Sequence, residues 1–242
     1  MASTRALDGL TIVFDLDGTL VDTAPDLIGA LNHTLTTSGL GTVPDIAVSE
    51  LIGSGAKAMI KAGLAHQNAE LPDDHIDDMF TTFLDFYIEN IAIDSRPYEG
   101  CEAALSRLTS AGATLAVCTN KRQNLADTLL LKLGLADRFE AIVGADSVPN
   151  RKPDPGHISE AIRRAGRSQS DAIMVGDSLT DERAAHGAGL PFILCPFGYG
   201  PVDETPPGHR FVLKRYADLT VEMALQITEA YAATVSRDTS DV

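Results

Sequence analysis

The sequence contains few cysteines, and their spacing matches no cysteine-based site. The three cysteines among its 242 residues are Cys101, Cys118 and Cys195. An odd number of cysteines without a C-x-x-C pair fits neither a disulfide framework nor a cysteine zinc site. Cys118 and Cys195 fall inside apolar runs, so we expect both to be small, buried hydrophobic residues.

Long apolar segments are also missing from the sequence. No run approaches the roughly 18 apolar residues that a membrane-spanning helix needs. The segment Met1–Leu10 lacks the apolar core of a signal peptide, because Asp8 interrupts it. We therefore predict a soluble, cytoplasmic protein that has no membrane partner.

Positive charge is scarce in this chain. It has 19 lysines and arginines against 34 aspartates and glutamates, which gives a formal net charge of -15 at pH 7. A surface this acidic repels a phosphate backbone, and no basic patch offsets it, so nucleic acid is not an expected partner. A site for an anion must then supply its own positive charge, and we expect a metal ion to contribute to it.

The remaining composition is that of a globular protein, with 44% hydrophobic and 22% charged residues, which excludes a disordered or fibrous chain. Short apolar runs alternate with helical patterns over most of the length. This alternation predicts a parallel sheet that helices cover on both faces. The expected strands are Leu10–Phe14, Ala113–Cys118, Ala141–Val143, Ala172–Val175 and Pro191–Cys195, and the helices between them include Glu102–Ala111, Asn124–Leu133 and Asp154–Ala165.

The alternation stops between residues 24 and 94, where we expect no buried strand. Helical patterns occupy this stretch at Pro25–Thr37, Ile46–Leu51, Gly55–His66 and Pro72–Ile91. Helices over about 70 residues between the first and second strands predict an inserted helical domain. The predicted units are a core of residues 1–22 and 95–235, a helical insert of residues 23–94 and a flexible tail of residues 236–242.

The strongest functional pattern, D-L-D-G-T-L-V-D-T, follows the first expected strand at residues 15–23. Ligands of open α/β sheets bind beyond the carboxyl ends of the strands, so we expect Asp15 and Asp17 to face a site. Two carboxylates this close do not both ionise easily without a cation or a shared proton between them. One can then act as an ionised nucleophile or ligand while the other donates a proton. A simple Asp-Gly turn is a weaker explanation of the whole pattern.

A second acidic pattern, V-G-D-S-L-T-D, occupies residues 175–181. It places Asp177 at another strand end, near Asp15 and Asp17. Asp181 falls at the start of a helix, where a carboxylate can also serve simply as a favourable partner of the helix dipole. A cluster of acidic oxygens without histidine or cysteine suits a hard cation such as Mg²⁺ rather than zinc.

Two further segments offer groups that bind an anion. Thr119 and Asn120 follow the strand Ala113–Cys118 and can donate hydrogen bonds to phosphoryl oxygens, although such a pair is often only a helix cap. Lys152 lies in R-K-P-D-P just before a helix, where the flanking prolines stiffen the loop. It is either a positioned point charge or a solvated loop lysine.

Together these four segments resemble the haloacid dehalogenase superfamily of phosphotransferases, in order and spacing, over nearly the whole chain. The first motif, T-N-K at residues 119–121 and G-Y-G at residues 198–200 are most similar to its phosphoglycolate phosphatase branch. The resemblance implies an α/β fold with a Rossmann-like parallel sheet core flanked by helices, and an inserted α-helical cap domain. It also implies a Mg²⁺-dependent phosphatase that acts on a small phosphorylated metabolite; we expect a monomer or a homodimer.

The resemblance assigns a role to each motif residue. Asp15 would attack phosphorus to form an aspartyl-phosphate, and Asp17 would protonate the leaving oxygen and later deprotonate water. Mg²⁺ would be held by the carboxylates of Asp15 and Asp177 and by the main-chain carbonyl of Asp17. Asp181 would act through water or by orienting Lys152. The residues expected to bind the phosphoryl oxygens are Thr19, Thr119, Asn120 and Lys152.

The cap is expected to select the substrate, because its helices would close over the leaving group and exclude water. Gly53, Ser54 and Lys57 are candidate contacts, since a glycine-flanked serine that opens a helix can present N–H groups to a carboxylate and Lys57 can pair with it. A simple helix start explains the same glycines. We predict a carboxylate-bearing phosphomonoester such as 2-phosphoglycolate as the substrate.

Other functions remain open from the sequence. Within the same superfamily they are a pyrophosphatase and a phosphosugar phosphatase or mutase. Outside it, receiver modules that accept a phosphoryl group also cluster aspartates and a lysine on a parallel sheet, but the insert and the length of 242 residues argue against one. A non-catalytic binding module is disfavoured because the set of motif residues is intact.

Overall fold

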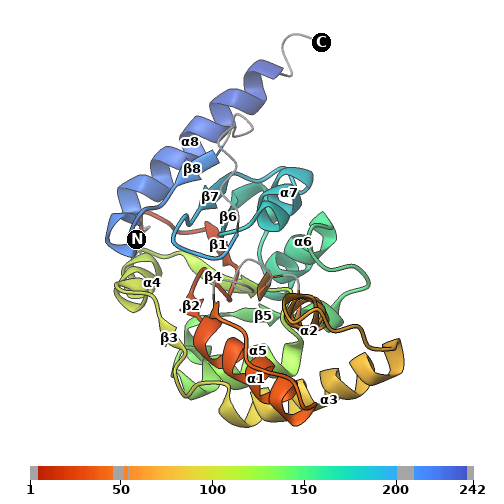
Figure 1. Ribbon diagram of the computed structural model, residues 1–242. Coiled ribbons are helices and arrows are strands. Elements are labelled where there is room, and N and C mark those ends of the chain that lie inside the picture. Colours follow the sequence, from red (N-terminus) through yellow and green to blue (C-terminus); the bar gives the residue numbers. More distant parts are fainter. Residues whose placement is uncertain (1–4, 46–51, 54, 201–209, 239–242) are drawn as a thin grey trace.

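A six-stranded parallel sheet forms the centre of the molecule (Figure 1). The computed structural model describes residues 5–45, 52–53, 55–200 and 210–238. The strand order is β5-β4-β1-β6-β7-β8, and every pair of neighbours runs parallel, which confirms the predicted α/β class. The strands are β1 (Thr11–Phe14), β4 (Thr114–Cys118), β5 (Ala141–Val143), β6 (Ala172–Gly176), β7 (Phe192–Leu194) and β8 (Arg210–Val212).

Helices cover both faces of this sheet. Successive residues of β1 point to opposite faces, so Ile12 belongs to one apolar cluster and Val13 to the other. The Ile12 side packs against α4, α5 and α8, and the Val13 side packs against α6 and α7. Burial on both faces explains why the strands appear in the sequence as continuous apolar runs. The bounds are α4 (Cys101–Ser110), α5 (Gln123–Lys132), α6 (Pro155–Arg164), α7 (Leu179–Gly187) and α8 (Val221–Asp238), with short 3₁₀ helices at Ala136–Arg138, Ala145–Ser147, Gln169–Asp171 and Tyr216–Asp218.

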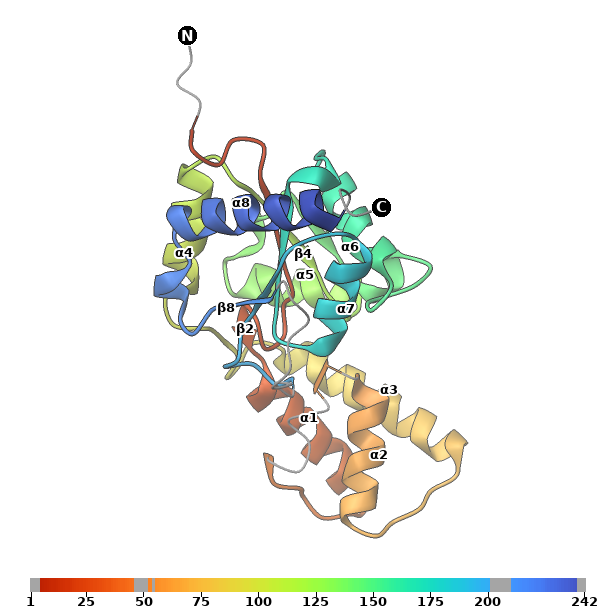
Figure 2. The same ribbon diagram turned by 90° about the horizontal axis from the view of Figure 1, so that it is seen from above.

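Three helices between β1 and β4 pack against one another and lie beside the sheet core (Figure 2). They approach closely at Gly63, where an added Cβ would lie 3.1 Å from a methyl group of Leu35. The helical pattern expected at Ile46–Leu51 lies outside the described residues, and the limits 23–94 of a separate domain stay a prediction. The helices are α1 (Ala24–Thr37), α2 (Ala56–His66) and α3 (Asp73–Asn90).

Two short strands join the helical insert to the core. β2 (Val21–Asp22) pairs antiparallel with β3 (Arg96–Pro97), so the chain leaves and re-enters the core side by side. The buried carboxylate of Asp26 in α1 strengthens this junction. It accepts hydrogen bonds from the N–H of Asp94 and from the N–H and hydroxyl of Ser95, at 2.6–2.9 Å.

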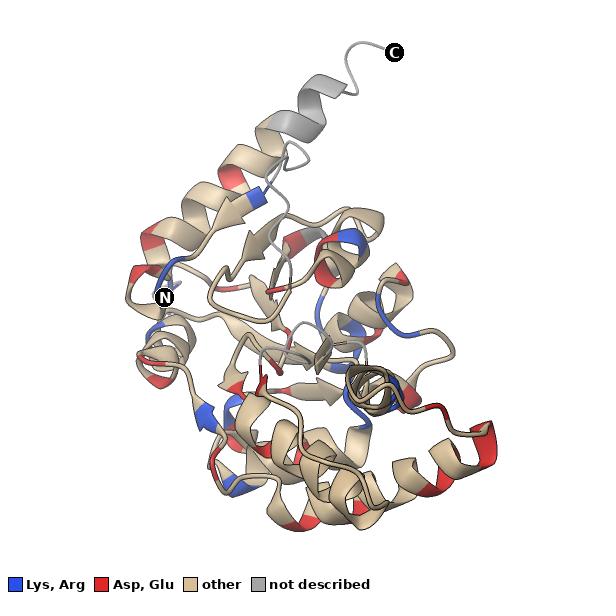
Figure 3. Cartoon of the chain, in the orientation of Figure 1, with Lys and Arg blue, Asp and Glu red and all other residues tan. Residues whose placement is uncertain are grey.

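Acidic residues are spread over many elements, including α3, α4 and α8 (Figure 3). Among the described residues, no helix combines the length and the apolar character that crossing a bilayer demands. The three cysteines are free and buried, as the apolar surroundings of Cys118 and Cys195 predicted.

Candidate active site

The candidate site lies at the carboxyl ends of the central strands. In the sheet, Phe14 at the end of β1 is level with Val117 of β4 and Val175 of β6. The polar residues that follow these three strands therefore meet at one edge of the sheet. This parallel register is what brings Asp15, Thr119 and Asp177 together.

Three carboxylates gather at this edge. Asp15, Asp177 and Asp181 each offer an oxygen atom, and these oxygens all lie within 4.8 Å of one another. Burial, as the largest cause, together with the charges of Asp181 and Asp177 raises the pKa of Asp15 to about 8, despite the attraction of Lys152. Burial and the neighbouring Asp181 raise the pKa of Asp177 to about 6. Oxygen ligands that resist ionisation without a counter-charge fit a hard divalent cation such as Mg²⁺.

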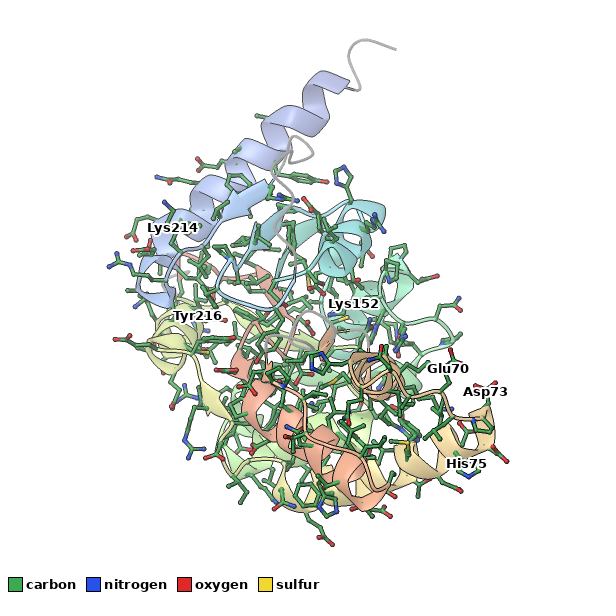
Figure 4. The ribbon with its side chains drawn as sticks, in the orientation of Figure 1. Glu70, Asp73, His75, Lys152, Lys214 and Tyr216 are labelled. Carbon is green, nitrogen blue, oxygen red and sulfur yellow. The ribbon has the colours of Figure 1, made fainter. Side chains whose placement is uncertain are left out.

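Lys152 is the central cation of the site. Its ammonium lies 2.8 Å from Asp15 Oδ1, and it donates hydrogen bonds of 2.6 Å to Asp181 Oδ1 and 2.7 Å to the carbonyl of Cys118. Lys152 is buried and is labelled near the middle of the molecule in Figure 4, whereas the exposed Glu70, Asp73 and His75 are labelled towards its edge. Lys152 is thus a positioned charge and not a solvated loop lysine.

Asp181 both caps a helix and contacts Lys152. One of its oxygens accepts from the N–H and hydroxyl of Ser178, and the Ser178 hydroxyl accepts from the N–H of Asp181, which completes a capping box for α7. The other oxygen accepts from Lys152. The two roles considered from the sequence therefore coexist in one side chain.

Asp177 is held in a tight backbone cradle. One oxygen accepts from the hydroxyl of Thr19 at 3.1 Å, and the other accepts from the N–H groups of Tyr199 and Gly200 at 2.7 and 3.2 Å. A Cβ on Gly198 would overlap Asp177, so the loop after β7 requires glycine there. The Thr19 hydroxyl thus orients Asp177, and its binding of a phosphoryl oxygen stays a prediction.

Asp17 is not a member of the three-carboxylate cluster and has partners of its own. Its Oδ1 accepts hydrogen bonds from the Thr23 hydroxyl at 2.7 Å and from the Lys121 ammonium at 2.8 Å. Burial lowers the pKa of Lys121, but the Asp17 carboxylate and Tyr87 outweigh that effect and raise it above its usual value. Asp17 and Lys121 therefore form a charged pair beside the cluster.

Thr119 and Asn120 lie between β4 and Lys152. The Thr119 hydroxyl is buried and accepts from the N–H of Lys121, while the Asn120 amide donates to the carbonyl of Lys152 at 3.0 Å. The Asn120 side-chain oxygen is buried without a hydrogen-bond partner among the described residues. Both residues line the cavity over the carboxylates.

His157 supports the Lys152 loop from behind. Its Nδ1 accepts from the N–H of Lys152 at 3.2 Å, so its Nε2 carries the proton that it donates to the carbonyl of Val143. Burial, with the nearby Lys152 charge, lowers the pKa of His157 to about 4. The neutral imidazole links the Lys152 loop to β5.

Comparison with known proteins agrees with this geometry. A model of the family described as haloacid dehalogenase-like hydrolase matches residues 12–195. The chain belongs to this hydrolase family. It is 42% identical over 219 residues to a protein of Caulobacter vibrioides named phosphoglycolate phosphatase, with 90% of this chain and 92% of that protein covered. A protein of the same name from Agrobacterium fabrum is 43% identical over 231 residues, with 96% of this chain and 99% of that protein covered.

A solved structure supports the same relationship. The crystal structure of a predicted phosphoglycolate phosphatase from Haemophilus somnus aligns with a TM-score of 0.81 at 30% identity and covers 92% of this chain and 98% of its own. The motifs therefore mark a haloacid dehalogenase-like hydrolase, and the receiver and binding-module alternatives are set aside.

The hydrolase has a cavity of about 980 Å³ over the carboxylates, lined by residues of the sheet core and of the helical insert. Gly53 and Lys57 line it, as expected for cap contacts. The Lys57 ammonium, however, pairs with Asp77 at 2.5 Å and its side chain is 51% exposed. Ser54 lies outside the described residues.

Two site residues of this hydrolase received no role from the sequence. Lys121 belongs to the T-N-K motif, but the motif did not indicate its partner Asp17, which is 104 positions away in the sequence. Tyr199 donates its hydroxyl to Asp22 and accepts from the N–H groups of Thr23 and Ala24, which ties the loop after β7 to the start of the insert. The glycine–tyrosine–glycine pattern marks this loop in the sequence, but it does not indicate which residues the tyrosine contacts.

Proposed function

We propose that this hydrolase is a Mg²⁺-dependent phosphatase of small phosphomonoesters and that 2-phosphoglycolate is its substrate. The observation that carries the proposal is the contact of one buried lysine with both Asp15 and Asp181, beside a cluster of three carboxylates. The names of the relatives support the substrate, and the family supports hydrolysis.

The charges of the site support a divalent cation. Asp15, Asp177 and Asp181 lie within 4.8 Å of one another through one oxygen each, and Lys152 is the cation that contacts two of them. With these four groups ionised, the excess negative charge of the cluster equals the charge of one Mg²⁺ ion. Asp15, Asp177 and the main-chain carbonyl of Asp17 would hold the ion, which when bound would neutralise charge on the phosphoryl oxygens.

The reaction would proceed in two displacements. In the first, an Asp15 oxygen bonds to phosphorus while the bond to the leaving oxygen breaks, and Asp17, which has taken up a proton before this step, gives that proton to the leaving oxygen. In the second, water attacks the phosphorus of the aspartyl-phosphate, its proton passes to Asp17, and Asp15 is released. Lys152, Thr119 and Asn120 would stabilise the charge on the transferring group.

Steady-state hydrolysis tests the proposal. We expect kcat/KM to be highest for 2-phosphoglycolate among 2-phosphoglycolate, pyrophosphate and phosphosugars, and activity to vanish when a chelator removes the metal. Asp15→Asn should abolish turnover while circular dichroism shows an intact fold, because the amide is not a nucleophile. Activity in the chelator, turnover by folded Asp15→Asn, or equal rates for 2-phosphoglycolate and esters with uncharged tails would contradict it.

A further inference from the structure

Lys121 is a buried cation on the wall of the cavity. Its side chain is 5% exposed, and its ammonium lies 2.8 Å from Asp17 Oδ1 and 4.8 Å from the centre of the Tyr87 ring. A lysine ammonium has three N–H donors, of which Asp17 takes one. The position therefore combines a fixed positive charge with donor capacity beyond the Asp17 pair.

Tyr87 brings a matching hydroxyl from the helical insert. It belongs to α3, is 1% exposed and lines the same cavity. Its hydroxyl is buried and makes no hydrogen bond of good geometry within the described part of the chain, although Lys121 is close enough to influence its pKa. A buried hydroxyl without such a bond costs free energy unless a ligand supplies a partner.

The other cations of the cavity wall are less suited to hold a second anion. Lys57 and Arg122 pair with Asp77 and Asp146, and their side chains are 51% and 53% exposed. Arg151 also lines the cavity, and it is exposed, so that solvent screens its charge. Lys152 directs its ammonium to Asp15, Asp181 and the carbonyl of Cys118. Solvent screens the exposed pairs, whereas a buried charge acts at a lower effective dielectric constant.

We propose that Lys121, with the hydroxyl of Tyr87, binds a carboxylate on the leaving group and so selects substrates with an anionic tail. This inference rests on the proposed function and names the residues that give it specificity. It assigns carboxylate recognition to Lys121, after the end of β4, and to Tyr87 of α3, in place of the Gly53 and Lys57 expected from the sequence.

The short distance between the ester oxygen and the carboxylate of 2-phosphoglycolate favours Lys121 as the carboxylate-binding residue. Asp17 would face the ester oxygen, and Lys121 contacts the Asp17 carboxylate directly. In 2-phosphoglycolate the carboxylate carbon is two bonds from the ester oxygen, so a cation that touches Asp17 is within reach of it. A sugar phosphate carries no anion at this position.

The test compares two substrates in one variant. Ethyl phosphate and 2-phosphoglycolate both need a proton on a poor leaving group, so any general effect of Lys121→Met on Asp17 cancels in their ratio of kcat/KM. We expect the ratio of 2-phosphoglycolate to ethyl phosphate to fall about tenfold to one hundredfold, which is the range for one charge-assisted hydrogen bond. Tyr87→Phe should lower the ratio by about three- to tenfold.

Charge-retaining and matched variants separate recognition from structural damage. Lys121→Arg keeps the charge and should hold the ratio within about fivefold of the wild type, because the Arg fork differs from an ammonium in geometry. Lys61→Met removes an exposed lysine of α2 that pairs with Asp73 at 3.9 Å, and it should leave the ratio unchanged. Thermal unfolding of each variant reports whether it is folded.

A second measurement needs no turnover. In the Asp15→Asn background, calorimetry should show that Lys121→Met weakens binding of 2-phosphoglycolate about tenfold or more and leaves the affinity for ethyl phosphate within about threefold. An equal loss of affinity for both ligands would overturn the inference.

The possible outcomes distinguish a failure of the Lys121 inference from a failure of the proposed phosphatase function. A wild-type protein that hydrolyses neither p-nitrophenyl phosphate nor 2-phosphoglycolate with Mg²⁺ would overturn the proposed function. A wild type that prefers 2-phosphoglycolate, with the same ratio in folded Lys121→Met, would overturn the inference alone. The inference would also fail if Lys57→Met, and not Lys121→Met, lowered the ratio.

Discussion

Single residues of the site are fixed by contacts that span most of the chain. Lys152 is 2% exposed and reaches Asp15 and Asp181, each from a different element. Removing its charge would leave these two carboxylates buried without their cation, which is costly in the interior. In the proposed reaction the same charge would act on the phosphoryl group.

Lys152→Met should lower kcat/KM for 2-phosphoglycolate by at least about 100-fold, because the loss of one preorganised electrostatic contact has effects of this size. Steady-state kinetics measures the loss. Lys132→Met, at an exposed position of α5, is the matched control and should behave as the wild type. A Lys152→Met enzyme within tenfold of the wild type would show that the lysine is dispensable for the reaction.

The motif residues could be predicted from the sequence, and some of their contacts could not. Strand-end aspartates are visible because each follows an apolar run, and parallel strands place their carboxyl ends at one edge. The Asp17–Lys121 pair and the donation from Thr19 to Asp177 depend on side-chain directions within loops. No periodicity in the sequence encodes such directions.

At the scale of elements, the junction between the insert and the core is stabilised by one buried carboxylate. Asp26 lies in the first turn of α1, where the helix dipole favours its charge, and it accepts from the N–H groups of Asp94 and Ser95. A helix at one end of the insert is thereby bonded to the chain at its other end. The orientation of the insert over the site depends on this connection.

Asp26→Ala should lower the free energy of unfolding by about 1.5–3 kcal/mol, because it leaves the N–H groups of Asp94 and Ser95 without a charged acceptor. Urea denaturation measures the change. Asp85→Ala, on the exposed side of α3, should change stability by less than about 0.5 kcal/mol. Equal stabilities of the two variants would argue against the proposed role of the junction.

The strands of the core were predictable because burial on both faces leaves an unbroken apolar run. The expected strand Ala113–Cys118 differs from β4 by one residue, and Leu10–Phe14 differs from β1 by one. β8 was not predicted, since it has three residues at the sheet edge and starts with Arg210. Its position follows from pairing with β7, which is a tertiary contact.

At the scale of the whole molecule, the acidic site opposes folding when no cation is bound. The pKa of Asp15 rises from 3.8 to about 8, and that of Asp177 rises from 3.8 to about 6. An acid with a raised pKa in the folded state binds more protons there than in the unfolded chain. Its contribution to stability is therefore complete below pH 3.8 and is lost as the pH rises towards 8.

Mg²⁺ should therefore stabilise the protein more at pH 8 than at pH 5, because protons compete with the ion for Asp15 and Asp177. With free Mg²⁺ at a hundredfold excess over its Kd, the stabilisation is about 2.7 kcal/mol. Calorimetric unfolding with and without Mg²⁺ at each pH measures it, and groups outside the site cancel in the difference. Equal increases in Tm at the two pH values would contradict the assignment of these carboxylates to the ion.

Direct trapping of the covalent intermediate tests the central claim most closely. The enzyme is mixed with Mg²⁺ and 2-phosphoglycolate, quenched in acid within the first turnover, and digested for mass spectrometry. We expect a phosphoryl group on the peptide that contains Asp15, and no such peptide from Asp15→Asn. A phosphoryl group on another residue, or turnover without any phosphorylated peptide, would contradict the account.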